Sequence, residues 1–413
     1  MCYSIPGRVV KVENKQIVLD YFGEKKVAIN ELGNIREGDY VFAQGGFVIE
    51  KVNAIEAEEI LAGWKERFAE LKAIDRKLSW SIVDGADFQV DSLSTYLSTD
   101  SESELKHICD IANRIRYKHL GNSCCVHGII EFSNYCRNNC YYCGIRCDNM
   151  TLKRYRMSIS EIVACAEYAV NNLGFRALVL QSGEDMYYTD DMLAEIISRI
   201  RDVCNTLIIV SVGSRSEECY KEMYGAGARG ALIRFETSNL ELYKKYHIGP
   251  KADWNHRFGL IKSAKDMGYL VATGSIIGLP GQTITDVLND ILLTKELGAE
   301  MYSFGPFIPH PNTPLAGNTS PNINLVLKTI AVSRMVSPNA KILVTTALET
   351  LDPEGLRKGL MAGANSFMIN VTPEKYRRLY DIYPRAHKNI EAKIKDTIEI
   401  LQSLGRAPSD FGI

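Results

Sequence analysis

The sequence of 413 residues predicts an α/β fold, a complete (β/α)8 barrel of the TIM type with a small β-barrel in front of it. From Gly128 onward, eight short apolar runs alternate with amphipathic helical stretches, which is the pattern of parallel strands joined by helices. Residues 1–52 instead carry β-rich runs separated by turn residues. A stretch with helical periodicity, Ala54–Leu78, lies between the two patterns.

The N-terminal unit is predicted from its β-rich runs and from the helix that follows them. Turn residues such as Glu13-Asn14 and Glu37-Gly38-Asp39 separate the runs. Ser79–Ser103 is mixed in character and rich in Ser and Asp, which indicates a domain boundary near residues 75–90. We therefore expect one domain over residues 1–78 and a second over residues 79–413. The expected strands are Arg8–Val12, Gln16–Tyr21, Lys26–Ile29 and Tyr40–Val52.

The second domain is predicted to close as a barrel because its eight runs alternate strictly with helical stretches. An open, doubly wound sheet is the alternative. In a barrel, the chemistry is expected at the C-terminal ends of the strands. The expected helices include Ser160–Asn172, Asp190–Val203 and Asp286–Leu297. The expected strands are Gly128–Phe132, Ala177–Gln181, Thr206–Val212, Gly230–Phe235, Leu270–Ser275, Glu300–Ser303, Lys341–Thr345 and Ser366–Ile369.

The composition indicates a globular protein and excludes several kinds of partner. Lys and Arg number 48 against 50 Asp and Glu, so no broad basic surface for a nucleic acid is expected. Hydrophobic residues make up 46% of the chain, which is enough for a large core. The longest apolar runs fall far short of the ~20 residues of a membrane helix, and no secretory signal is visible. We expect a cytoplasmic protein without a membrane partner.

Six of the eleven cysteines fall within residues 124–147, which indicates a metal centre rather than a disulfide framework. Cys136, Cys140 and Cys143 follow the first strand of the expected barrel with the spacing C-x3-C-x2-C. Three thiolates on one loop can hold three irons of a [4Fe–4S] cluster and leave the fourth iron open. A zinc site or reactive thiols are the alternatives. The remaining cysteines of this segment, Cys124, Cys125 and Cys147, lie outside the spacing and are interpreted as structural.

This motif resembles that of the radical S-adenosylmethionine (SAM) superfamily. The likeness is closer to the HydE type of [FeFe]-hydrogenase maturase, through residues 130–157, LQSGED (180–185), GSIIGLPGQT (274–283), FGPFIPHPNTPLA (304–316) and VTTA (344–347). The resemblance implies that the open iron binds SAM and that one electron cleaves it to methionine and a 5′-deoxyadenosyl radical. It implies a small or organometallic substrate, a one-electron reductant and hydrogenase maturation proteins as partners.

The resemblance also implies which residues bind SAM and substrate. Glu236 and Arg257 match SAM-binding positions, with Arg257 pairing with the methionine carboxylate, and Tyr142 is expected beside the adenine. Expected polar groups of the same site follow the second to fourth strands, where carboxylates suit an amine and an arginine suits a carboxylate. The substrate pocket is expected at Thr345, Thr346, Met368 and Tyr383. The remaining residues assigned to SAM are Gln181, Ser182, Gly183, Glu184, Ser211 and Arg234.

The N-terminal unit resembles the HypC/HupF hydrogenase chaperones, through MCYSIPG at its start and the segments GDYV (38–41) and GFVI (46–49). The chaperones' essential cysteine follows the initiator methionine, so the resemblance implies a metal-binding thiol at Cys2. A histidine of that family is replaced by Gln44, which is a poor ligand for soft iron.

Three functions are carried forward from these patterns. We predict a radical SAM enzyme that acts in assembly of the hydrogenase diiron site on a small sulfur-containing or iron–cysteine precursor. The first alternative is an amino-acid mutase similar to methylornithine synthase, which a more apolar pocket at Ile209 and Phe235 would suit. The second alternative is a non-catalytic carrier of iron clusters. Because no cysteine follows Cys219, no accessory C-terminal cluster is expected. His310, between two prolines, is interpreted as a rigid loop residue rather than a ligand.

Overall fold

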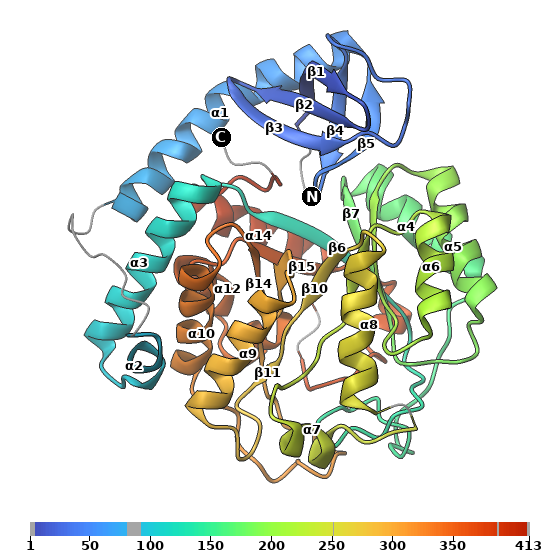
Figure 1. The fold of residues 1–413 in the computed structure, drawn as a ribbon, viewed down its shortest axis with the longest axis vertical. Helices are drawn as coiled ribbons and strands as arrows, with labels where there is room; N and C mark the ends of the chain where they lie inside the picture. Colours follow the sequence, from blue (N-terminus) through green and yellow to red (C-terminus); the bar gives the residue numbers. More distant parts are fainter. Residues whose placement is uncertain (1–4, 81–91, 251, 386–387, 411–413) are drawn as a thin grey trace.

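The computed structural model describes residues 5–80, 92–250, 252–385 and 388–410, and contains two closed barrels (Figure 1). All eight strands expected in the second domain form, and they close as a parallel barrel in the order β10-β12-β14-β15-β6-β7-β8-β9. The open sheet is therefore excluded. The five strands before them form a separate closed barrel in the order β1-β2-β3-β5-β4.

The small barrel has one strand more than the sequence predicted. The run Tyr40–Val52 is not a single strand but an antiparallel hairpin. Gly45 and Gly46 form its turn with φ values of 60° and 83°, which two-residue hairpin turns require and which glycine adopts without strain. The strands are β1 (Gly7–Glu13), β2 (Gln16–Tyr21), β3 (Glu24–Ile29), β4 (Tyr40–Gln44) and β5 (Phe47–Val52).

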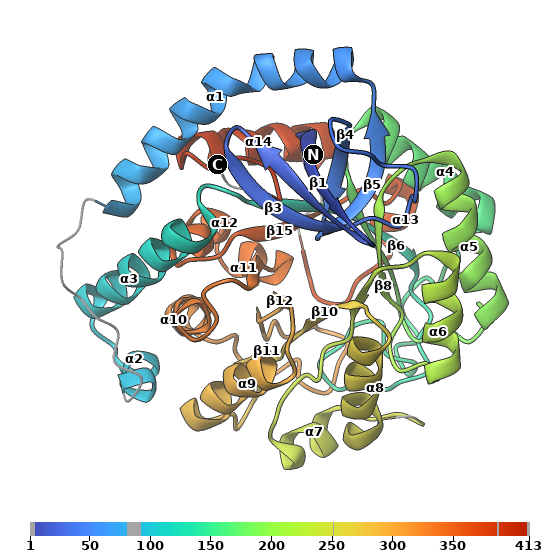
Figure 2. The ribbon, with the colours of Figure 1, turned by 45° about the horizontal axis from the view of Figure 1, so that its top comes forward.

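Three helices connect or flank the two barrels, and the first runs along the outside of both (Figure 2). The expected helix Ala54–Leu78 extends two residues further. The predicted domain boundary after residue 78 falls in its last turn, and residues 81–91 lie outside the described residues. The helices are α1 (Ala54–Trp80), α2 (Leu93–Ser98) and α3 (Glu102–Leu120).

The large barrel alternates strands and helices as predicted. Its strands are β6 (Cys125–Ser133), β7 (Ala177–Ser182), β8 (Leu207–Ser211), β9 (Gly230–Leu232), β10 (Leu270–Thr273), β12 (Met301–Tyr302), β14 (Lys341–Val344) and β15 (Ser366–Asn370). Its helices are α4 (Ile159–Glu167), α5 (Asp190–Val203), α6 (Glu217–Ala226), α7 (Leu240–Tyr246), α8 (Trp254–Asp266), α9 (Ile284–Glu296), α10 (Ile323–Val336), α11 (Thr346–Leu351), α12 (Gly355–Met361), α13 (Glu374–Arg377) and α14 (Ile390–Ser403). The last turn of the expected helix Ser160–Asn172 is a π-helix, Tyr168–Asn172.

One strand is interrupted where the sequence predicted continuity. The fifth strand ends at Thr273 because Gly274 has φ 156° and lies so close to Ser303 that a Cβ would be 2.3 Å from its carbonyl oxygen. The chain then forms β11 (Ile276–Ile277), which pairs with β13 (Gly305–Pro306) in a separate two-stranded sheet. This small sheet extends the barrel wall beyond the C-terminal ends of β10 and β12.

The small barrel covers the opposite, N-terminal end of the large barrel (Figures 1 and 2). Its hairpin turn projects into that end, where a Cβ on Gly45 would lie 2.7 Å from Leu270 and 2.9 Å from Leu207, the first residues of β10 and β8. An ion pair of 3.3 Å between Arg176 and Glu50 adds a polar contact beside the turn. The described residues of the first domain thus lie at the end of the barrel opposite the C-terminal ends of its strands.

We expect Gly45→Val to destabilise the chain by about 1–3 kcal/mol more than Gly46→Val does. Both glycines have positive φ, so both variants carry backbone strain, but a side chain at Gly46 meets nothing within 4 Å. The difference between the two variants therefore isolates the contact of the hairpin with the barrel. Urea unfolding followed by circular dichroism measures it. Equal losses for the two variants would show that the turn does not press on Leu207 and Leu270.

Within the part of the chain that the structure describes, the helices lack the combination of length and apolar character that crossing a membrane requires.

Candidate active site

The three cysteines of the motif lie on the loop that follows β6, at the C-terminal end of the barrel. Backbone hydrogen bonds fasten this loop to the end of α7 and the segment after it. Tyr141 N donates to Tyr246 O at 2.9 Å, and Asn139 N donates to Ile248 O at 2.6 Å. Cys140 is buried, and Cys136 and Cys143 are partly buried. The loop therefore presents its thiols toward the protein interior rather than to solvent.

The surroundings of the three cysteines favour the neutral thiol, so a positive partner such as a metal ion is needed to stabilise the thiolate. Burial raises the pKa of all three, to about 12 for Cys143, and the negative charges of neighbouring cysteines raise the pKa of Cys140 and Cys143 further. Among the described residues, no three His, Cys, Asp or Glu side chains converge on one metal position. Three thiolates that each bind a different iron of a cluster need not share one metal position.

Gly183 lets the end of β7 pass directly against the cysteine loop. A Cβ at this position would lie 2.2 Å from Tyr135 O and 2.9 Å from the Cβ of Cys136. Gly183 N also donates to Ser133 O at 3.0 Å. No side chain larger than hydrogen fits without moving the backbone that carries Cys136.

We expect Gly183→Ala to reduce the iron content of the reconstituted chain severalfold, because the methyl group displaces the loop that carries Cys136. It should also cost about 1–3 kcal/mol of stability. The control is Gly259→Ala in α8, where an added methyl group meets nothing within 4 Å. Iron analysis and urea unfolding measure the two effects. Full iron content in Gly183→Ala would show that a methyl group at this position does not displace the loop that carries Cys136.

A cavity of about 260 Å³ lies beside the cysteine loop within the C-terminal end of the barrel. It brings together residues from the ends of β7, β8 and β9 and from β11 and β13, as expected for an active site at the C-terminal end of a barrel. Its apolar wall includes Leu232, Ile233, Ile276, Phe307 and Ile308. The predicted site residues that line it are Tyr142, Cys143, Gln181, Ser182, Ser211, Arg234, Glu236, Arg257 and Tyr383.

Arg234 and Glu236 place one positive and one negative group on the wall of this cavity. Arg234 Nη2 lies 3.2 Å from Glu236 Oε2. Arg234 Nε is buried and has no hydrogen-bond partner among the described residues, so it can donate to a carboxylate. Glu236 has φ 69°, a conformation that costs energy for a residue with a side chain and that concentrates at functional sites. The pair can bind an ammonium and a carboxylate on one ligand.

A buried network behind the cavity fixes Arg257. Its Nη2 donates to Glu184 Oε1 at 2.9 Å and lies 3.2 Å from His247 Nε2. His247 Nδ1 in turn bonds the hydroxyl of Tyr142 and lies 3.4 Å from Cys140 Sγ. Burial and the charge of Arg257 lower the pKa of His247 well below its ordinary value, so the imidazole is neutral.

The structure gives Glu184 a different place from the predicted one and adds His247, which was not predicted. Glu184 does not line the cavity; its carboxylate accepts from Arg257, from Ser214 N at 2.8 Å and from Arg137 Nε at 3.2 Å. Sequence reasoning missed His247, which connects Tyr142, Cys140 and Arg257. Its sequence context, a lone histidine after α7, carries no metal or catalytic motif, so only the fold reveals it.

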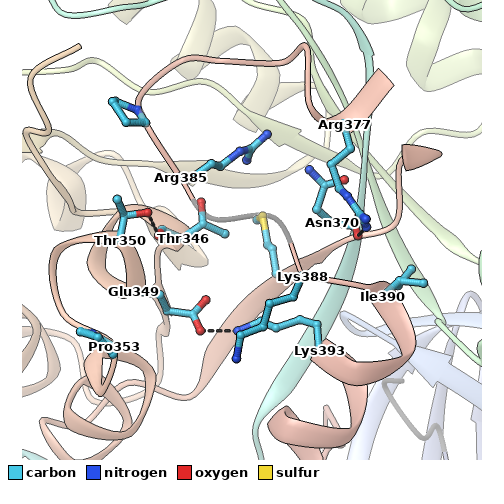
Figure 3. A pocket seen from close by; sticks show the side chains of 12 residues that line it. Thr346, Glu349, Thr350, Pro353, Asn370, Arg377, Arg385, Lys388, Ile390 and Lys393 are labelled. Carbon is cyan, nitrogen blue, oxygen red and sulfur yellow. Dashed lines mark hydrogen bonds and ion pairs between the residues drawn. The ribbon is translucent and has the colours of Figure 1, made fainter. Parts of the chain in front are cut away.

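Three of the four residues predicted for substrate line two different cavities, and Thr345 lines neither of them. Tyr383 lines the first cavity, and its hydroxyl bonds the Thr346 hydroxyl. Thr346 and Met368 line a second cavity of about 630 Å³, shown in Figure 3 with Arg377 and other lining residues. Thr345 Oγ1 is buried without a hydrogen-bond partner among the described residues. The bond between Thr346 and Tyr383 therefore lies at the boundary between the two cavities.

Two residues that the sequence analysis expected in the pocket lie elsewhere. Ile209 lines a cavity at the N-terminal end of the barrel, and Phe235 is fully buried in the core. The expectation that they make the active-site pocket more apolar is wrong, because neither residue lines the cavity beside the cysteine loop. His310 bonds Asp381 at 2.9 Å and lies against Gly144. Cys2 lies outside the described residues.

Three family models match the chain. Residues 130–293 match the radical SAM superfamily, residues 1–64 match the HupF/HypC family, and residues 303–406 match the biotin and thiamin synthesis associated domain. The HupF/HypC match covers the small barrel, and the other two matches fall within the large barrel.

Relatives of known name are similar over most of the second barrel. The chain is 39% identical to the [FeFe] hydrogenase maturase subunit HydE of Thermotoga maritima, over 79% of this chain and 94% of that one. It is 29% identical to 3-methylornithine synthase of Methanosarcina acetivorans, over 79% and 92%. The crystal structure of methylornithine synthase (PylB) superposes with a TM-score of 0.69 at 25% identity, over 81% of this chain and 97% of that one. The chain therefore belongs to the HydE family of radical SAM enzymes, with a HypC-like domain at its N-terminus.

Proposed function

We propose that this enzyme acts in assembly of the hydrogenase diiron site, on a small sulfur-containing or iron–cysteine precursor. The observation that carries the proposal is the 39% identity to HydE across 94% of that protein's length. It is supported by the cavity that joins the cysteine loop to a paired arginine and glutamate. The enzyme is proposed to be cytoplasmic. Its two domains are proposed to comprise residues 1–78 and 79–413.

Cys136, Cys140 and Cys143 are proposed to hold a [4Fe–4S] cluster, with SAM in the adjoining cavity. The bound cluster supplies the electron that cleaves SAM. Arg257, held by Glu184 and His247, presents its guanidinium to the methionine carboxylate without having to reorganise. Glu236 accepts from the ammonium group. Gln181, Ser182 and Ser211 offer further polar atoms from the ends of β7 and β8.

The chain's own residues also protect a reactive carbon radical from side reactions. The apolar wall formed by Ile233, Ile276 and Phe307 excludes water from the cavity. Tyr142 closes the side that faces the cysteine loop. The substrate is proposed to enter through the second cavity and to meet SAM where Thr346 bonds Tyr383, with Thr345 and Met368 beside it.

The experiment compares candidate substrates with the reconstituted full chain under anaerobic conditions. SAM and dithionite are added with an iron–cysteine complex or with free amino acids, and 5′-deoxyadenosine and substrate products are quantified. The proposal expects turnover with the iron–cysteine complex. Rearrangement of the free amino acid instead would establish the mutase, which the 0.69 TM-score to methylornithine synthase keeps as the second candidate. Binding of iron complexes with no deoxyadenosine under any condition would favour a carrier.

The HypC-like domain is proposed to deliver, receive or dock a metal precursor through the thiol of Cys2. Its match to the HupF/HypC family supports this role. In a hydrogenase maturation assay, Cys2→Ser should lower hydrogenase activation while the cleavage of SAM stays unchanged. Unchanged activation would refute a role for the thiol.

A further inference from the structure

The floor of the large barrel, at the end opposite the cysteine loop, is polar. Cys125 and His127 occupy alternate positions at the start of β6, so their side chains lie on one face of the strand. Both residues are at most 1% exposed. Barrel interiors are ordinarily filled by branched apolar side chains, so a thiol and an imidazole in this layer require an explanation.

The two side chains contact each other and the first domain. Cys125 Sγ lies 3.3 Å from His127 Nε2. Gln44, from the last position of β4 in the small barrel, donates from Nε2 to Cys125 Sγ at 3.2 Å. On its other side, His127 Nδ1 lies 3.4 Å from the hydroxyl of Ser366. A proton on Nδ1 directed at Ser366 leaves the lone pair of Nε2 facing the sulfur.

A cavity of about 700 Å³ adjoins this cluster between the two barrels. His127 lines it, together with the hairpin turn at Gly45 and Gly46. Asp410, also in its wall, is already paired with Lys341 and with Gly45 N. Lys26 and Lys295 also line this cavity, and the imidazole of His127 borders its open space, which can admit a small ligand.

We propose that Cys125 and His127 form a binding site for one thiophilic transition-metal ion at the interface of the two domains. With metal–sulfur and metal–nitrogen bonds of about 2.3 and 2.0–2.1 Å, a tetrahedral ion holds its sulfur and nitrogen ligands roughly 3.6 Å apart. The observed separation of 3.3 Å needs only a small adjustment. Thiolate and imidazole are the donor types that soft divalent ions select.

The surroundings provide what such a pair of ligands needs. Ser366 orients the imidazole through the nitrogen that would not bind the metal, as the partners of metal-bound histidines do. On binding, Cys125 loses its thiol proton to solvent, and the amide of Gln44 gives up its bond to the sulfur. Because the chain contributes two ligands and only His127 of the pair lines the cavity, water or exchangeable small ligands would complete the coordination from the side of the imidazole. The site therefore suits reversible binding better than a structural role.

The test uses the full chain with Cys2, Cys136, Cys140, Cys143 and Cys147 all changed to serine, so that added metal can bind neither the cluster site nor the thiols of Cys2 and the exposed Cys147. Under anaerobic conditions, Co²⁺ is titrated and the thiolate-to-cobalt charge-transfer absorption is recorded. Two further variants add Cys125→Ser or His127→Gln to this parent. The matched control adds Cys165→Ser, which removes a buried thiol that donates to the carbonyl of Val371.

The proposal expects one equivalent of Co²⁺ with a thiolate band in the parent and in the Cys165→Ser control. The affinity should fall at least tenfold in Cys125→Ser and in His127→Gln. Thermal unfolding verifies that each chain is folded, and the parent titration alone decides the matter if both variants unfold. A folded parent without the band, or a band that survives both substitutions, would overturn the proposal. Neither result involves SAM or the cluster, so the proposed enzymatic function is tested separately.

Discussion

Replacing Cys136, Cys140 or Cys143 with alanine is expected to abolish both the iron–sulfur absorption and the formation of 5′-deoxyadenosine. Each thiolate is proposed to hold a different iron, so the loss of any one leaves an iron of the cluster without its protein ligand. Anaerobic reconstitution, iron analysis and quantification of deoxyadenosine after addition of SAM and dithionite measure the effect. Activity should fall to background in all three variants.

The matched control is Cys147→Ala. This thiol belongs to the same loop but is exposed and lies outside the spacing of the motif. It should retain the full iron content and the full yield of deoxyadenosine. The buried thiols of the three cluster positions also pack against neighbours, so unfolding curves are needed to separate loss of the cluster from loss of the fold. A variant that lacks Cys140 yet keeps cluster absorption and deoxyadenosine would contradict the assignment.

The fold was predictable because its determinants are local in the sequence. The helix Asp190–Val203 has the predicted ends because Thr189 caps it, with its side chain accepting from Met192 N. The error at Tyr40–Val52 is of the same local kind. Two glycines sit inside an apolar run there, and the apolar character of the run concealed the turn that they form.

The site was predictable only as far as its sequence motif reaches. The spacing of Cys136, Cys140 and Cys143 is local, and so is the glycine after β7. The contact of Arg257 with both Glu184 and His247 joins three separate segments that meet only when the barrel closes. The same holds for the meeting of Gln44 with Cys125, since it depends on how one barrel docks on the other. Such contacts are set by the fold and leave no periodic signal.

Asp75 is the negative charge of a buried junction between α1, α3 and the C-terminal segment. Arg116 donates to its two carboxylate oxygens at 2.5 and 2.7 Å, and Arg406 Nε lies 3.5 Å from Oδ1. All three side chains are at most 1% exposed. Burial and repulsion from Arg116 lower the pKa of Arg406 to about 10. The carboxylate therefore offsets a concentration of positive charge that burial makes costly.

Asp75→Asn should lower the free energy of unfolding by about 3–5 kcal/mol, because it leaves Arg116 and Arg406 buried without a negative partner. Asparagine keeps the size of the side chain, so the loss reports charge rather than packing. The control is Asp110→Asn, which breaks the Lys106–Asp110 pair on the surface of α3 and should cost less than about 1 kcal/mol. Urea unfolding of both variants measures the difference. Equal losses in the two variants would contradict this prediction. They would mean that backbone carbonyls such as Gly121 O, which already accepts from Arg116, are sufficient partners for the buried arginines. The charge of Asp75 would then not be needed to attach α1 to the barrel.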